Sequence, residues 1–385
     1  MLILEMPTEL YTKCQKNKER TDIMLKIREN VDLKELEIRK LTPKECWRLM
    51  GFDDSDFEKA EKVNSNSQLY KQAGNSIVVP CLEGIINNLK IDGKIRVLEL
   101  FGGIGACSKA IERLGINYEI ADYVEIDKYA VKSYNAIHGT NFEPQDITTW
   151  NKDIKVDLIM HGSPCQDFSL AGKQAGGDKG SGTRSSLMYE TIRIVEKLQP
   201  KYVIWENVKN LLSEKHKHNF DAYLETMKQL GYTNYYQVLN AKDYGIPQNR
   251  ERIFTVSIRN DIDINFEFPP KRPLKLKLKD MLEDEVDEKY YLNNKQMDRI
   301  NTSLFHQEKT MVQEKDYCDT LCVRDYKDPK CIEVVRKYGI FDTDNQKHQA
   351  GSVYDENGLS PTLDTMQGGY RQPCVEIVEK WSDLD

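Results

Sequence analysis

The stretch "IRVLELFGG", residues 95–103, decides the fold, because a run that favours a buried β-strand ends in two glycines. Helix-like and strand-like segments alternate after it. Helices are expected at residues 106–115, 128–139, 187–199 and 219–231, and strands at 118–127, 157–161 and 202–208. Residues 234–259 read as two strands flanking a loop. This alternation predicts an α/β fold, with a parallel sheet covered by helices on both faces.

Upstream, residues 39–52 carry a strong helix start. Thr42 can cap the helix, Pro43 suits its first position, and Glu45 completes a capping box. Gly51 is expected to end this helix. A second helix is predicted to open at Gly74, Asn75 and Ser76, and to run toward residue 90.

The α/β pattern dissolves near Pro269, where polar segments and turn signals take over. We therefore expect five regions. They are a charged segment at 1–37, a helical block at 38–90, a sheet domain at 95–268, a smaller irregular domain at 269–378 and a tail at 379–385.

Composition limits the class of protein. The chain has 385 residues, 39% hydrophobic and 30% charged, as is ordinary for a soluble globular protein. We expect no membrane span, and the N-terminal apolar run is too short for a signal peptide. The nine cysteines lack metal-type pairing apart from Cys318 and Cys322, so we expect reduced thiols, no metal site and a cytoplasmic location. The net charge of −7 argues mildly against a nucleic-acid partner, although a local basic cleft would suffice to bind phosphates.

Chemically useful residues follow the predicted strands, at the sheet edge where ligands bind in open α/β folds. In chain order they are Phe101, Gly103, Ile104, Gly105, Glu125, Ile126, Cys165, Glu206, Gln248, Arg250 and Arg252. The glycines fit either a ligand-binding loop or an ordinary tight turn. A carboxylate about 20 residues further on favours a nucleoside-containing cofactor, since it can bind ribose hydroxyls, without saying which cofactor.

Cys165 follows a strand and lies between Pro164 and Gln166. A free cysteine is usually a small buried hydrophobe, but this position favours an exposed thiolate nucleophile. Glu206 is either a solvated carboxylate or a buried one able to share a proton with a ring nitrogen. Arg250 and Arg252 are either a surface charge run or paired guanidinium donors. Together these residues suit an electron-poor ring that accepts a thiolate.

Four ordered motifs resemble the cytosine-5 DNA methyltransferase family: "FGGIG", "GSPCQDFSLAG", "ENVKN" and "QNRERIF". The resemblance covers residues 39–90 and 96–259 closely. It implies a Rossmann-like, S-adenosylmethionine-dependent methyltransferase sheet with an irregular target-recognition domain. It also implies that the enzyme is cytoplasmic, in a bacterial or phage-infected cell, and acts on double-stranded DNA as a monomer.

The resemblance also implies roles for residues. Cys165 would attack C6 of a cytosine flipped out of the duplex, Glu206 would hold and protonate N3, and Arg252 would contact O2, with Arg250 beside it. Residues 166–184 would form a flexible lid. Further positions match the family's S-adenosylmethionine contacts: Phe101, Gly103, Ile104, Gly105, Glu125 for the ribose, Ile126, Asp146 for adenine, Ile147, Pro164, Asn75 and Ser76.

The motif order departs from the family pattern. The blocks "LTPKECWRLMGF" and "QAGNSIVVP" usually close the chain, whereas here they come first. The chain therefore resembles a circular permutant, with its ends opened between the recognition region and residue 39. The basic run at 271–279 would contact phosphates or serve as a solvated linker.

Three other functions compete. They are methyl transfer to a tRNA cytosine, a catalytically silent DNA-binding protein, and a nicotinamide-dependent oxidoreductase. The long stretch after Pro269 favours DNA over tRNA. Cys165, Glu206 and Arg252 argue against the other two, which leave these residues without roles.

Overall fold

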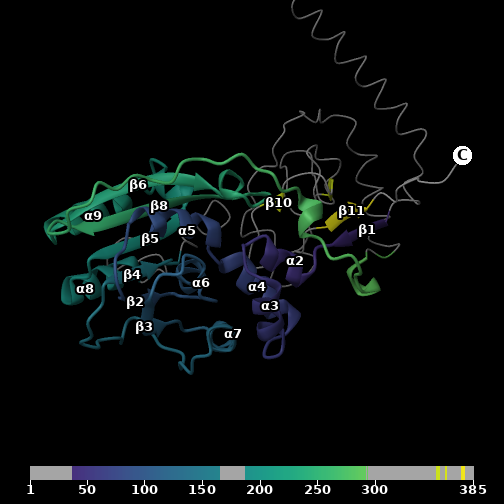
Figure 1. Cartoon of the computed structure of the whole chain (residues 1–385), viewed down its shortest axis with the longest axis horizontal. Helices are drawn as coiled ribbons and strands as arrows, with labels where there is room; N and C mark the ends of the chain where they lie inside the picture. Colours follow the sequence, from purple (N-terminus) through teal and green to yellow (C-terminus); the bar gives the residue numbers. More distant parts are fainter. Residues whose placement is uncertain are drawn as a thin grey trace, which may run out of the picture.

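The computed structural model describes residues 37–164, 187–291 and 293, and three short strands within 353–377 (Figure 1). Cys165, the predicted lid at 166–184, Cys318, Cys322 and nearly all of the segment at 1–37 lie outside the described residues. The division into domains stays a prediction.

A mixed six-stranded sheet forms the centre of the molecule, in the order β3-β2-β4-β5-β8-β6. Its strands are β2 (Ile95–Leu100), β3 (Tyr118–Val124), β4 (Leu158–His161), β5 (Tyr202–Val208), β6 (Tyr232–Asn240) and β8 (Glu251–Arg259). The predicted α/β class and Rossmann-like sheet are confirmed. The predicted parallel arrangement is confirmed for β2, β3, β4 and β5. The strand β8 is antiparallel to both β5 and β6. The connection from β6 to β8 is too short for a crossover helix, so these two strands pair antiparallel.

Helices cover both faces of the sheet, as predicted. They are α6 (Ala106–Arg113), α7 (Lys128–His138), α8 (Met188–Leu198) and α9 (Lys217–Gln229), together with α5 (Val79–Asn88). Along β5, Ile204 packs into the core with α5 and α6, whereas Val203 and Trp205 pack into the core with α8 and α9. Since side chains alternate along a strand, Glu206 faces the α5 side.

The N-terminal block consists of β1 (Glu37–Lys40), α2 (Pro43–Arg48), α3 (Asp54–Glu61), α4 (Asn66–Asn75) and α5. The predicted capping box of Thr42 and Glu45 is confirmed, and Gly51 follows the helix with a φ of +84°. The predicted start of the second helix was wrong. Gly74 and Asn75 end α4, and α5 begins only at Val79 because the chain is extended at Val78 and Pro80 suits the first turn.

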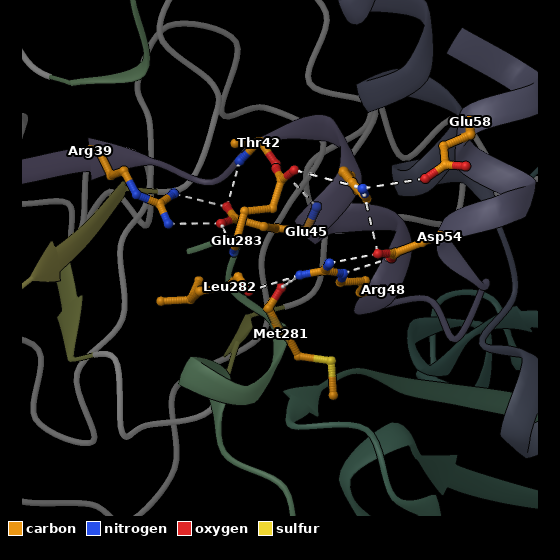
Figure 2. Close-up of polar contacts among 10 residues, drawn as sticks. Arg39, Thr42, Glu45, Arg48, Asp54, Glu58, Met281, Leu282 and Glu283 are labelled. Carbon is orange, nitrogen blue, oxygen red and sulfur yellow. Dashed lines mark hydrogen bonds and ion pairs between the residues drawn. The ribbon is translucent and has the colours of Figure 1, made fainter. Parts of the chain in front are cut away.

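A buried polar network joins this block to the start of the predicted recognition region (Figure 2). The guanidinium group of Arg39 donates two hydrogen bonds to Glu45, at 2.9 and 2.7 Å, and both side chains are almost fully buried. Glu45 also accepts the main-chain N–H of Glu283 at 2.9 Å. Arg48 donates to the carbonyls of Met281 and Leu282. Breaking a buried ion pair is costly, so this network holds residues 281–283 against α2.

Further short 3-10 helices and strands complete the described part. They are Lys209–Leu212, Ala241–Tyr244, Leu278–Met281 and Glu288–Tyr290, with β7 (Gln248–Asn249), β9 (Val353–Asp355), β10 (Ser360–Pro361) and β11 (Cys374–Ile377). Leu278 and Met281 are buried in the same core as the N-terminal block. β1 pairs antiparallel with β11, with Glu37 opposite Ile377 (Figure 1). The end of β11 therefore lies beside the start of β1.

Candidate active site

The glycine-rich turn after β2 is a tightly held loop at the carboxyl edge of the sheet. Phe101 has a φ of +55°, a conformation that non-glycine residues rarely adopt, and its N–H donates to Val124 O at 2.7 Å. Tyr123 donates its hydroxyl to Gly103 O at 2.6 Å. A Cβ at Gly105 would lie 2.3 Å from His138 Nε2, whereas one at Gly103 would meet nothing within 4 Å. The loop is packed from behind at Gly105 and open at Gly103, where a ligand could approach its backbone.

Glu125 and Ile126 lie beside this opening, after β3. Glu125 Oε2 accepts the N–H of Gly103 at 3.1 Å, and Oε1 accepts the N–H of Asp127 at 2.8 Å. Burial raises the pKa of Glu125, and these N–H donors oppose the rise. Ile126 is 68% exposed. A carboxylate beside an exposed aliphatic side chain suits a ligand with hydroxyls and a flat apolar ring.

Asp146 is exposed on the next loop. Its Oδ1 accepts two hydrogen bonds from Thr148, one from the main-chain N–H at 2.9 Å and one from the side-chain hydroxyl at 2.8 Å. Ile147 and Ile104 are 4% and 1% exposed. Their side chains therefore support the loops from inside the core. Of the predicted cofactor residues in these loops, those whose side chains can face a ligand are Phe101, Glu125, Ile126 and Asp146.

Glu206 lies in the buried part of β5 and pairs with Arg252, whose Nε lies 3.1 Å from Glu206 Oε1. Burial raises the pKa of Glu206, and the charges of Arg252 and Arg250 offset the rise only in part. Such a carboxyl group holds its proton to a higher pH than an exposed one. A Cβ at Gly162 would lie 3.8 Å from Glu206 Oε2 and 3.7 Å from Ile77 Cδ1. Glu206 therefore faces both the loop that precedes Cys165 and the N-terminal block.

The neighbours of Glu206 on β5 hold that loop. Trp205 donates its indole N–H to Ser163 Oγ at 3.0 Å, and Asn207 Nδ2 donates to Ser163 O at 3.4 Å. The loop continues through Pro164, which is half-buried, to Cys165 in the sequence. Because Ser163 precedes Cys165 by two residues, β5 both supplies Glu206 and anchors the backbone that leads to the thiol.

Arg250 is only 4% exposed, and its Nη2 donates to Gly74 O at 3.0 Å and Ser76 O at 2.9 Å. The structure thus brings Arg250 against the backbone around Asn75 and Ser76, while Arg252 pairs with Glu206. Ser76 is buried and Asn75 is exposed. The sequence pattern did not suggest that Arg250 would bind this turn. The catalytic role expected for Arg250 stays a prediction.

Sequence reasoning missed several residues that shape the site. They are Tyr123 and His138 behind the glycine loop, Trp205 beside Glu206, and Lys71 and Gln72 on α4. Only the apolar context of β5 gave a signal for Trp205. The others are long-range pairs that no local spacing reveals. Among the described helices, none is long and apolar enough to cross a membrane.

Comparison with known proteins places these features in one family. The family model described as C-5 cytosine-specific DNA methylase matches residues 4–91 and 95–371. The orphan methyltransferase M.SPRI of Bacillus phage SPR is 32% identical over 321 residues, covering 75% of this chain and 68% of the relative. The type II methyltransferase M2.ScrFI of Lactococcus lactis subsp. cremoris is 37% identical over 258 residues, covering 53% of this chain and 71% of the relative.

Among solved structures, the S. pombe Dnmt2 methyltransferase matches with a TM-score of 0.43 and 20% identity, covering 55% of this chain and 67% of that one.

Proposed function

Because the chain belongs to the C-5 cytosine-specific DNA methylase family, we propose that it methylates C5 of a flipped-out cytosine in duplex DNA, with S-adenosylmethionine as methyl donor and Cys165 as covalent nucleophile. The observation that carries the proposal is the Glu206–Arg252 pair, which faces the loop that leads to Cys165. The predicted identity as a DNA cytosine-5 methyltransferase agrees with the family and with relatives described as type II methyltransferases.

The chemistry follows from the protonation states of these residues. The Cys165 thiolate adds to C6 of the cytosine, while protonated Glu206 donates its proton to N3. Addition makes C5 nucleophilic, and S-adenosylmethionine, when bound, would supply the methyl group there and would leave as S-adenosylhomocysteine. A base then removes the C5 proton, the C6–S bond breaks, and N3 returns its proton to Glu206, which releases 5-methylcytosine and the thiolate. Arg252 holds Glu206 in place and donates toward O2 of the base.

The residues at the sheet edge fit this cofactor. The opening beside Gly103 can admit the methionine part of S-adenosylmethionine. Glu125 can accept ribose hydroxyls, and exposed Ile126 can cover one face of adenine. Asp146 lies on the adjacent loop, and Asn75 and Ser76 come from the N-terminal block. These residues would bind and orient S-adenosylmethionine.

A methylation assay with tritium-labelled S-adenosylmethionine tests the proposal against tRNA methylation. The protein should label duplex DNA that contains its target sequence and leave tRNA unlabelled. Nuclease digestion and mass spectrometry should find the label in 5-methylcytosine. Label in tRNA alone would support the tRNA reaction, and binding of DNA without transfer would support a silent binding protein.

The reversed motif order is part of the proposal. Its support is that Ile377 lies opposite Glu37 in an antiparallel pair, so a short turn could join the end of β11 to the start of β1. In addition, the family model matches two segments that meet at residues 92–94.

We expect a relinked chain, in which a two-residue turn joins residue 377 to residue 37 and the new ends open at residues 92–94, to fold and to methylate the same target. A matched control opens the chain in the middle of β5, where it should fail to fold. A relinked protein that melts cooperatively but methylates no DNA would contradict the permuted arrangement.

A further inference from the structure

Helix α4 of the N-terminal block contacts the corner between β3 and α7, which carries Glu125 and Ile126. Lys71 Nζ lies 2.5 Å from Asp127 Oδ2. Gln72 Nε2 donates to Tyr129 O at 3.0 Å, and Gln72 Oε1 accepts the hydroxyl of Ser133 at 2.9 Å. Two consecutive side chains of α4 thus make three polar contacts with residues 127–133.

Asp127 connects Lys71 to the candidate cofactor site. Its N–H donates to Glu125 Oε1 at 2.8 Å, and its own Oδ1 accepts the N–H of Tyr129 at 2.9 Å, which caps α7. Burial works against ionisation of Asp127, but the hydrogen bond from Lys71, the main-chain N–H donors of α7 and the charge of Lys71 together outweigh it and lower the pKa of this carboxyl group. Both side chains are about three-quarters buried, at 25% and 23% exposure. The pair is therefore shielded enough to constrain the corner, unlike a fully solvated surface pair.

The middle and the C-terminal end of α4 contact different parts of the site. Its middle holds the corner at 125–133, while Arg250 holds the carbonyls of Gly74 and Ser76 at its C-terminal end. Gln72 is buried, at 5% exposure, and its amide has no local partner on α4 among the contacts above. Both polar atoms of the Gln72 side-chain amide thus bind a segment more than 50 residues away in the sequence.

We propose that Lys71 and Gln72 are positioning residues for cofactor binding, which hold Glu125 and Ile126 at the geometry that the ribose and adenine require. This proposal rests on S-adenosylmethionine being the cofactor. Both side chains would act through the corner at 125–133, with which they make the contacts above. The expected effect is therefore on the dissociation constant and KM for S-adenosylmethionine, with kcat and DNA affinity unchanged.

The test is isothermal titration calorimetry with S-adenosylmethionine on the full chain. Lys71→Met and Asp127→Asn should each weaken binding about tenfold, and the double variant should be no worse than either single change. Asp127→Asn keeps a good helix cap and removes only the charge. Lys71→Arg should restore binding, and Gln72→Ala should weaken it by a similar factor.

A matched control uses the ion pair of Lys94 and Glu119, which has the same 2.5 Å separation between nitrogen and oxygen. This pair lies at the N-terminal ends of β2 and β3, away from the candidate cofactor site, and both of its side chains are half exposed. Lys94→Met should leave S-adenosylmethionine binding unchanged. Equal binding by wild type, Lys71→Met and Asp127→Asn would overturn the positioning role, as would loss of binding that Lys71→Arg fails to restore. If the wild-type protein itself binds no S-adenosylmethionine, the proposed function fails instead.

Discussion

Replacing Cys165 with serine should reduce methyl transfer by about 10³-fold or more, because a hydroxyl is almost never ionised near neutral pH and is a far weaker nucleophile than a thiolate. Cofactor affinity should stay within about twofold, since the side chains that can face the cofactor, at Phe101, Glu125, Ile126 and Asp146, lie on other loops. The measurement is kcat for transfer of labelled methyl to duplex DNA, together with calorimetric binding of S-adenosylmethionine.

Other cysteines provide internal controls for this prediction. Cys81 and Cys107 are buried, and burial raises the pKa of each thiol, which keeps them protonated and unreactive. Cys107→Ala should therefore retain activity in whatever fraction of the protein folds. A kcat equal to that of the wild type in Cys165→Ser would show that Cys165 is not the nucleophile.

Replacing Glu206 with glutamine should lower kcat by about 10²- to 10³-fold, because N3 of the cytosine loses its proton donor while the side chain keeps its shape. The wild-type pH profile carries the same information. Burial raises the pKa of Glu206, and the reaction needs the protonated form, so activity should fall as pH rises through that pKa. The glutamine variant cannot titrate, and this part of the alkaline decline should be absent from its profile.

Glu251 offers a matched control, since it lies next to Arg252 and pairs with Lys209 at 2.9 Å on the exposed side. Glu251→Gln should change kcat by less than about twofold. An unchanged kcat and pH profile in Glu206→Gln, or an equal loss in Glu251→Gln, would show that Glu206 is not the proton donor.

Sequence reasoning predicted well where short-range rules decide the structure. The capping box at Thr42 and Glu45 depends on residues three apart, and the structure confirms it. The strand leading into Glu206 has a continuous apolar pattern that only a buried strand explains, so its burial and the raised pKa of the carboxyl group could be anticipated. Glu125 beside the glycine loop was found in the same way, from its place after the next strand.

Sequence reasoning gave no information where distant segments decide the structure. The direction of β8 depends on which strand it joins, and a strand pattern carries no sign of direction. The partners of the Arg250 side chain are the carbonyls of Gly74 and Ser76, which lie far away in the sequence. Lys71 and Gln72 likewise look like ordinary polar helix residues. Only the packing of α4 against the corner at 125–133 reveals their contacts.

The central claim is that Cys165 forms a covalent bond to cytosine C6, and trapping with 5-fluorocytosine tests it most directly. Fluorine at C5 cannot leave as a cation, so after methyl transfer the thioether cannot be released. A duplex with 5-fluorocytosine at the target should form an adduct that survives denaturing electrophoresis and requires S-adenosylmethionine, with peptide mass spectrometry placing the nucleotide on Cys165. Cys165→Ser should bind the same duplex and form no adduct. An adduct carried by another cysteine, or one that persists in Cys165→Ser, would contradict the mechanism.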